Sequence, residues 1–221
     1  MRKSIVFLFA AAFIILQGCG AVRVSKNPDG DLTAWRISGV GTVQPAPAEK
    51  AFRVTEGSAS KGLTLVSPRT FGKNAVVRFG VKPERYEGVC VVLLSASDKN
   101  TGGLAVPPNH DGSLGFWSEG TVQNYMFAFH TGFHQPNMYI KRNPGMNDIA
   151  QAKDIAAGQT WYDMEIGRAG ARLWMKVGGK IVLEGTDPGS GLPGGYIGIR
   201  LRGPGDGSFS CLFRDLTVRE K

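Results

Sequence analysis

The chain has 221 residues, a formal net charge of +8 and 42% hydrophobic residues, which fits one domain of the all-β or α/β class. Its positive residues are scattered, and no run of five like charges occurs. No nucleic-acid-binding motif is recognisable, so we expect no nucleic acid as a partner. The charge balance leaves a polyanion open as a partner, either an acidic polysaccharide or an anionic lipid surface.

The first residues have the pattern of an export signal. Arg2 and Lys3 precede an apolar run at 4–16 that is too short to cross a bilayer comfortably, and the run ends in Leu-Gln-Gly-Cys. The segment resembles a bacterial lipoprotein signal, which implies cleavage before Cys19 and lipid on that cysteine; the alternative is an ordinary secretory signal. We expect a signal peptide at 1–18, a lipidated tether at 19–30 and one domain at 31–221. The implied location is export and anchoring to the bacterial cell envelope, where several acyl chains on Cys19 bind the membrane stably.

Two further cysteines, Cys90 and Cys211, lie inside apolar strand-like runs. An oxidising compartment favours a disulfide between them, whereas the alternative is two separate buried thiols, and both alternatives stay open. No Cys/His spacing predicts a metal site, and we expect no cofactor. The acids Asp98 and Asp111 are too sparse to predict a bound calcium ion.

The first half of the domain reads as short strands between Gly- and Pro-rich turns. Strands are predicted at 31–43, 52–54 and 62–66. Residues 75–83 alternate between apolar and polar, whereas 86–95 are apolar on both faces, as in a central strand covered by two layers. A long Gly/Pro/Asn loop follows at 98–111, and loops of this length are often functional.

The second half alternates more clearly. A strand at 125–129 is predicted to form a hairpin with 138–142, and 149–157 is predicted to be a loop or a single turn. Gly178-Gly179 is typical of a two-residue hairpin turn. Further strands are predicted at 161–167, 171–177, 181–184, 196–201 and 208–219. About a dozen short strands without a convincing helix predict an all-β fold, a two-sheet antiparallel β-sandwich of the jelly-roll kind.

The strand order from Trp161 to the end resembles the closing half of the concanavalin A-like lectin/glucanase jelly rolls. The segments that carry the resemblance are LWMKVGGKIVLEGTDP, GGYIGIRLRG and FRDLTV. By strand order the resemblance covers most of the chain, and it implies the fold more specifically than the function.

A narrower resemblance lies in the central stretch, 123–148. The run from Tyr125 through Lys141-Arg142-Asn143-Pro144-Gly145 is similar to a motif of the YesU-like bacterial family of concanavalin A-like proteins. The C-terminal strands also resemble the 3-keto-disaccharide hydrolase group. Because the YesU-like proteins occur near sugar-catabolic functions, the resemblance implies a carbohydrate partner, an oligo- or polysaccharide.

Catalytic candidates gather in the same stretch. A polysaccharide lyase needs a base and cationic groups that neutralise a uronate, and His130, His134 and Arg142 are the candidates for these roles. A glycoside hydrolase needs two carboxyl groups; Asp163 and Glu165 share a strand face, but the third acid of the laminarinase pattern is absent. We expect no metal at the two histidines, because their i, i+4 spacing binds metal on a helix.

A binding module instead needs aromatic rings that stack on sugar faces and side chains that hydrogen-bond hydroxyl groups. The substrate-binding candidates combine both kinds: Trp117, Asn124, Tyr125, Arg142, Trp174 and Arg200. The alternatives are structural, with Trp174 covering a sheet edge and residues 142–145 forming a turn.

The sequence thus predicts carbohydrate recognition or processing on the concave sheet face of an exported, lipid-anchored jelly roll. Whether the protein is an enzyme stays open. The alternatives are a lyase or hydrolase acting on an oligosaccharide, and a structural envelope lipoprotein without a sugar ligand. Alternation places Tyr125 and Phe129 on one strand face and His130 with Asn124 on the other, and the hairpin is expected to bring Arg142 beside His130.

Overall fold

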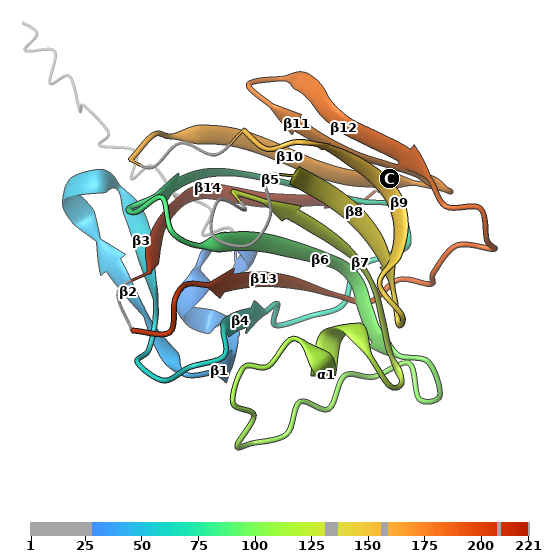
Figure 1. Ribbon diagram of the computed structural model, residues 1–221, viewed down its shortest axis with the longest axis horizontal. Coiled ribbons are helices and arrows are strands. Elements are labelled where there is room, and N and C mark those ends of the chain that lie inside the picture. The colour runs from blue at the N-terminus through green and yellow to red at the C-terminus, as the bar shows by residue number, and fades with distance from the viewer. Residues whose placement is uncertain (1–27, 131–136, 156–158, 207–208, 221) are drawn as a thin grey trace, which may run out of the picture.

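The structure is a computed structural model that describes residues 28–130, 137–155, 159–206 and 209–220. Within these residues the chain forms two antiparallel sheets of seven strands each, packed as two layers (Figure 1). Sheet A has the order β1 (Arg36–Gly39), β4 (Leu63–Val66), β13 (Tyr196–Arg202), β6 (Val89–Asp98), β7 (Val122–Phe129), β8 (Asn137–Asn143), β9 (Asn147–Lys153). Sheet B has the order β12 (Lys180–Thr186), β11 (Arg172–Val177), β10 (Tyr162–Ala169), β5 (Ala75–Pro83), β14 (Ser210–Glu220), β3 (Ala51–Glu56), β2 (Gly41–Ala46). The predicted all-β sandwich is confirmed.

The two C-terminal strands lie in the middle of the sheets rather than at their edges. β13 lies between β4 and β6, and β14 lies between β5 and β3, so late strands complete both layers. The helical turns are short: η1 (Pro28–Gly30), η2 (Leu32–Ala34), η3 (Pro47–Glu49) and α1 (Gly115–Ser118). In the part of the chain that the structure describes, no helix has the length and apolar character needed to cross a membrane.

The core between the sheets follows from the alternation of β6 and β7. Val92 lies opposite Phe127, and the neighbouring Tyr125 and Phe129 point the same way, all of them buried against sheet B. Burying a large apolar side chain stabilises a fold by about 1.5–3 kcal/mol. The predicted orientation of the three aromatic residues of β7 is therefore confirmed.

The opposite face of β6 and β7 is buried as well, under the segment 99–121. Leu93 and Met126 pack there in one cluster with Trp117 of α1. In Figure 1 the right-hand ends of β6 and β7 bend down toward α1, so this segment covers the concave side of sheet A. The two-sided apolar character predicted for β6 is confirmed, and the long loop predicted before α1 belongs to a packed cover.

Two buried asparagines fasten α1 to sheet A. The Nδ2 atom of Asn124 donates to the carbonyl of Trp117 at 2.6 Å, and the Nδ2 atom of Asn143 donates to Oδ1 of Asn124 at 2.9 Å. The N–H of Gly145 donates to the carbonyl of Ser118 at 2.8 Å. The Asn143-Pro144-Gly145 turn therefore has the structural role that the sequence left open.

Residues 147–153 form the edge strand β9, where the sequence predicted a loop or a single turn from residue 149. β9 pairs with β8, and most of its side chains are exposed or half-buried, so no apolar alternation marks it in the sequence. Its Ile149 and Ala150 lie against Gly185 of β12, where an added Cβ would come within 2.7 Å of the Ile149 side chain. This close backbone approach joins the two sheets along one edge of the sandwich.

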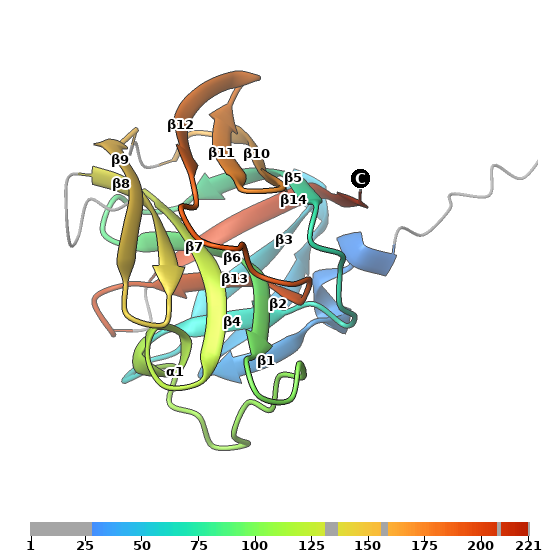
Figure 2. The same ribbon diagram turned by 90° about the vertical axis from the view of Figure 1, so that its right-hand side faces the viewer.

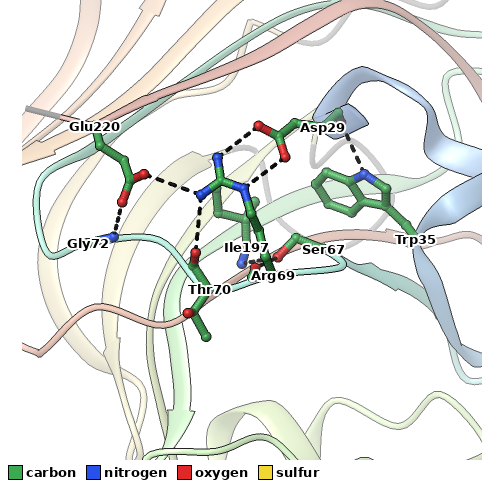
Figure 3. Close-up of polar contacts among 8 residues, drawn as sticks. All are labelled: Asp29, Trp35, Ser67, Arg69, Thr70, Gly72, Ile197 and Glu220. Atoms are coloured by element: carbon green, nitrogen blue, oxygen red, sulfur yellow. Dashed lines mark hydrogen bonds and ion pairs between the residues drawn. The ribbon is translucent and has the colours of Figure 1, made fainter. Parts of the chain in front are cut away.

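The folded part begins earlier than predicted, because residues 28–30 pack on the domain instead of belonging to the tether. Nη2 of Arg69 lies 3.0 Å from the carboxylate of Asp29, and Nη1 lies 3.3 Å from Glu220 at the end of β14 (Figure 3). The indole of Trp35 donates to the carbonyl of Asp29 at 3.1 Å. One guanidinium thus joins the first described residues to the last strand.

Cys90 of β6 and Cys211 of β14 face each other between the sheets as free thiols, with their sulfurs 3.5 Å apart. Both side chains are buried, and burial raises the pKa of the Cys211 thiol well above its ordinary value. Because the thiolate is the reactive form, the Cys211 thiol is inert in the folded protein, and burial shields Cys90 from reagents in solution.

We expect a fragment of residues 28–221, purified without reductant, to show no thiol that reacts with an aromatic disulfide reagent in its native state. After unfolding in guanidinium, both Cys90 and Cys211 should react, and a Cys211→Ala control should show one thiol. If thiols appear only after reduction, the two cysteines form the disulfide that the sequence left open.

Candidate functional site

A pocket of about 430 Å³ opens beside the β8–β9 turn, where β12 ends. Its lining consists of Arg142, Asn147, Asp148, Ile149, Asp187, Pro188 and Gly189. In Figure 2, β12 and the segment that follows it run beside β8 and β9. The volume lies within the usual range of small-molecule sites, roughly 300–1,000 Å³. We call this hollow the Arg142 pocket.

Asp187 forms the inner wall of the Arg142 pocket. Its side chain is fully buried, and its carboxylate accepts from Arg142 Nη1 at 2.9 and 3.0 Å. It also accepts from the Tyr125 hydroxyl at 2.5 Å and from the N–H of Gly189 at 2.9 Å. Burial raises the pKa of this carboxyl, but the three donors outweigh burial and hold the pKa below its ordinary value. Asp187 is therefore ionised at neutral pH.

Tyr125 connects the pocket to the interior of the sandwich. Its hydroxyl donates to Asp187 and accepts from the N–H of Leu192 at 3.0 Å, and burial raises its pKa. The guanidinium of Arg168 lies 4.9 Å from the Tyr125 ring centroid and donates to Ser95 Oγ at 3.0 Å. Because every one of these groups is held by others, the network fixes the position of Arg142 in advance of any ligand.

The mouth of the pocket carries one cation and one anion. The Arg142 side chain is 30% exposed, and within the described residues its Nε and Nη2 atoms make no hydrogen bond. Asp148 is 57% exposed and accepts from Lys141 Nζ at 2.6 Å and Gln151 Nε2 at 3.0 Å, which together lower the pKa of its carboxyl. The pocket thus offers N–H donors on one side and carboxylate acceptors on the other.

The sequence identified Arg142 and Tyr125 but none of the partners that place them. Tyr125 was expected to stack on a ligand, whereas its ring is fully buried and its hydroxyl does the positioning. Asp187-Pro188-Gly189 does signal a turn in which the carboxylate accepts from the N–H two residues later. That local signal marks the turn, and it says nothing of the ion pair with Arg142.

The other predicted binding residues do not come together at a surface. Trp117 and Asn124 are fully buried under the cover of sheet A, and Arg200 is 3% exposed. Trp174 is 6% exposed on the outer face of sheet B, where its ring lies over Gly167 and its indole donates to a carboxylate at 2.8 Å. For Trp174 the structural alternative, a ring that covers the sheet, fits this placement.

Arg200 is a buried cation beneath the same cover. Its guanidinium donates to the carbonyls of Gly112 at 2.6 Å and Lys61 at 2.8 Å. Burial lowers its pKa to about 10, so it stays protonated at neutral pH. These hydrogen bonds connect two loops to β13, and the buried guanidinium is not accessible to a ligand.

His130 and Arg142 lie toward opposite ends of the β7–β8 hairpin. Arg142 pairs with Tyr125, which precedes His130 by five residues, a separation of roughly 16 Å at about 3.3 Å per residue. The φ angle of His130 is +50°, and its ring stacks on Phe209 with centroids 6.1 Å apart. The prediction that Arg142 lies beside His130 is therefore wrong, because the hairpin register places Arg142 opposite Tyr125. The prediction that His130 shares a face with Asn124 is wrong as well, because the positive φ takes His130 out of the strand alternation.

His130 is 1% exposed, and its Nε2 atom donates to the carbonyl of Arg85 at 3.0 Å. His134 lies outside the described residues, so the catalytic role predicted for it stays a prediction. Among the described residues, no three His, Cys, Asp or Glu side chains gather in a way that could hold a metal ion.

A second pocket, of about 360 Å³, lies on the outer face of sheet B beside Asp163 and Glu165. Glu165 accepts from Arg78 Nε at 2.6 Å and Trp174 Nε1 at 2.8 Å, and Lys176 Nζ lies 2.9 Å away. Burial raises the pKa of Glu165, but these three donors outweigh it and bring the pKa to about 2. An ionised carboxylate of this kind does not serve as the general acid of a glycoside hydrolase.

Replacement of Trp117 by alanine should destabilise the fold, because it leaves a cavity between α1 and sheet A. We expect a loss of about 3–5 kcal/mol in the free energy of unfolding, measured by urea denaturation. Trp161→Ala is the matched control: that ring is half-buried, with Arg214 4.1 Å from its centroid, and its loss should cost less. Equal losses in the two variants would contradict the covering role of Trp117.

The stability of the protein should fall in acid partly because of His130. Burial lowers the pKa of His130 from its ordinary value of 6.5. As pH falls through that value, the unfolded chain takes up a proton that the folded chain does not, so this contribution is complete above pH 6.5 and is lost below it.

We therefore expect the unfolding free energy of the wild type to decrease more between pH 7 and pH 5 than that of His130→Gln, whose amide keeps a donor for the Arg85 carbonyl. Urea titrations at both pH values measure the difference. The other acid-sensitive groups are common to both proteins and cancel. Parallel decreases would show instead that folding leaves the pKa of His130 unchanged.

No protein-family model and no curated protein matches the chain. The narrower resemblances, to the YesU-like family and to the 3-keto-disaccharide hydrolase group, therefore stay predictions.

Solved structures match over most of the chain. A Bacillus subtilis protein with a galectin-like fold superimposes with a TM-score of 0.77 at 18% identity, over 88% of this chain and 94% of that one. The carbohydrate binding module CBM66 from Bacillus subtilis gives a TM-score of 0.58 at 14% identity, over 85% and 96% of the two chains. A Bacillus licheniformis β-glucanase gives 0.55 at 12% identity, over 81% and 82%. At such identities the likeness shows the fold alone: a two-sheet antiparallel jelly roll, as the strand order predicted.

Proposed function

We propose that the protein is a carbohydrate-binding module whose glycan site is the Arg142 pocket. The observation that carries the proposal is a guanidinium fixed by a buried carboxylate, with two of its nitrogens free among the described residues, at the mouth of a pocket of about 430 Å³. Arginine and carboxylate groups bind sugar hydroxyls, while Ile149 and Pro188 give the pocket an apolar side for the C–H face of a ring. Among the structural neighbours, a carbohydrate binding module and a β-glucanase are in keeping with a sugar ligand.

The proposed site differs from the one that the sequence predicted. A glycan on the concave face of sheet A would have to displace Trp117 and the rest of the segment 99–121, which bury Leu93 and Met126. The Arg142 pocket needs no such displacement, because it lies at the edge of the sheet beside β9 and is open to solvent. The binding site therefore moves from the middle of the concave face to its rim.

Binding is favoured over catalysis by the state of the pocket's acids. The pKa values of Asp148 and Asp187 are both lowered by their hydrogen-bond donors, so neither carries a proton to donate near neutral pH. The lyase and hydrolase alternatives would rest on His134, outside the described residues, because His130 is buried away from the pocket.

The proposal includes anchoring through lipid on Cys19. Residues 20–27 separate Cys19 from the first described residue, and eight extended residues span at most about 29 Å. A tether of this length would hold the domain close to the envelope membrane. Glycan recognition would then take place at that surface.

Substitution Arg142→Lys tests the site, since it keeps a positive charge beside buried Asp187 but loses the planar fork of donors. We expect at least about a tenfold loss of affinity for any neutral or acidic oligosaccharide that the wild type binds on a glycan array, measured by calorimetry. Arg53→Lys is the matched control: Arg53 on β3 forms a two-point ion pair with Glu84, and this variant should bind like the wild type.

Wild-type affinity in Arg142→Lys would place the glycan elsewhere on the protein. An array on which the wild type binds nothing would favour the remaining alternative, a structural envelope lipoprotein without a sugar ligand.

A further inference from the structure

We infer that the Arg142 pocket selects uncharged sugars and excludes glycans that present a carboxylate to it, such as uronates. The inference rests on the proposed function and adds a ligand class to it. The supporting observation is the burial of the two ion pairs in the pocket: in each pair, one residue is more buried and the other is more exposed.

The positive charge of Arg142 is already neutralised from behind. The carboxylate of Asp187 lies 2.9 and 3.0 Å from Nη1, is fully buried and cannot leave the pair, because Tyr125 and Gly189 also hold it. Arg142 therefore acts on a ligand as a set of directed N–H donors backed by an opposite charge, rather than as a free cation. Such a group binds a hydroxyl oxygen well and gains less from a ligand carboxylate than an unpaired arginine does.

The opposite side of the mouth has the reverse arrangement. Asp148 and Lys141 are paired at 2.6 Å, but the carboxylate is 57% exposed and the Lys141 side chain only 14%. A ligand therefore meets the anion of this pair and not the cation. Lowered pKa values keep both Asp148 and Asp187 ionised at neutral pH, so the lining residues carry one positive and two negative charges.

Together these groups offer donors at Arg142 and acceptors at Asp148 on either side of one hollow. A sugar hydroxyl both donates and accepts, so a pair of neighbouring hydroxyls can satisfy both sides. A uronate carboxylate only accepts, and in the pocket it would meet the like charges of Asp148 and Asp187. Asp148 is the specificity-determining residue, because it is the exposed acid that a ligand carboxylate would meet.

The test compares matched ligands that differ only in charge. Oligouronides of several linkages, among them oligogalacturonate and alginate oligomers, are paired with the same oligomers after chemical reduction of each carboxyl to a hydroxymethyl group. Neutral gluco-, manno- and galacto-oligosaccharides complete the panel, and calorimetry at low salt gives the affinities. We expect the wild type to bind at least one neutral oligosaccharide, and to bind uronides at least about tenfold more weakly than their reduced partners.

Asp148→Asn should narrow the gap between each uronide and its reduced partner several-fold, because it removes the exposed like charge. Asp163→Asn, in the second pocket on sheet B, is the matched control and should leave the ratio unchanged. Tighter binding of uronides than of their reduced partners, or an unchanged ratio in Asp148→Asn, would overturn this inference and leave the glycan site standing. Absence of binding by every member of the panel would overturn the proposed function itself.

Discussion

A central sheet that is apolar on both faces must be covered twice, and this constraint organises the molecule. β6 and β7 turn one row of side chains toward sheet B and an almost equally apolar row toward the concave side. The second row includes Leu93 and Met126, which in contact with water would lose about 1.5–3 kcal/mol each of burial free energy. The segment 99–121 provides the cover, and the buried chain from Asn143 through Asn124 to the Trp117 carbonyl holds it in place. Consequently the concave surface is part of the core, and polar chemistry is displaced to the rim.

At the rim, charge takes the place of apolar packing. A buried ionised carboxylate is costly unless its oxygens are satisfied, and Asp187 meets this condition with donors from Arg142, Tyr125 and Gly189. Each donor comes from a different part of the chain: β8, β7 and the segment after β12. The same contacts that remove the desolvation cost therefore also lock the sheet edge together and fix the direction of the Arg142 fork.

The sequence predicted the features that depend on local periodicity. The double-sided β6, the three inward aromatic side chains of β7 and the sandwich itself all follow from alternation at a period of two. β9 was not predicted, because an exposed edge strand needs no apolar pattern and is held by its hydrogen bonds to β8. His130 was misplaced because a single residue with positive φ cancels the alternation at that point, and no glycine or asparagine marks it.

The candidate site was predicted least well, for a different reason. Residue types such as Trp117 and Arg200 suit sugar binding, but packing between segments that are far apart in the sequence decides whether they meet a ligand. Arg142 was found by motif, whereas Asp187 is 45 residues away along the chain and is brought to it only by the contact between the two sheet edges. Pairings of this kind depend on tertiary structure and have no counterpart in local sequence.

The junction at Arg69 has a topological meaning as well as an energetic one. One guanidinium contacts both Asp29 and Glu220, so the domain begins and ends at the same corner of the sandwich (Figure 3). Domains whose two ends lie close together tolerate circular permutation and insertion into other proteins. The way in which this jelly roll is attached to its surroundings is thus separable from its fold.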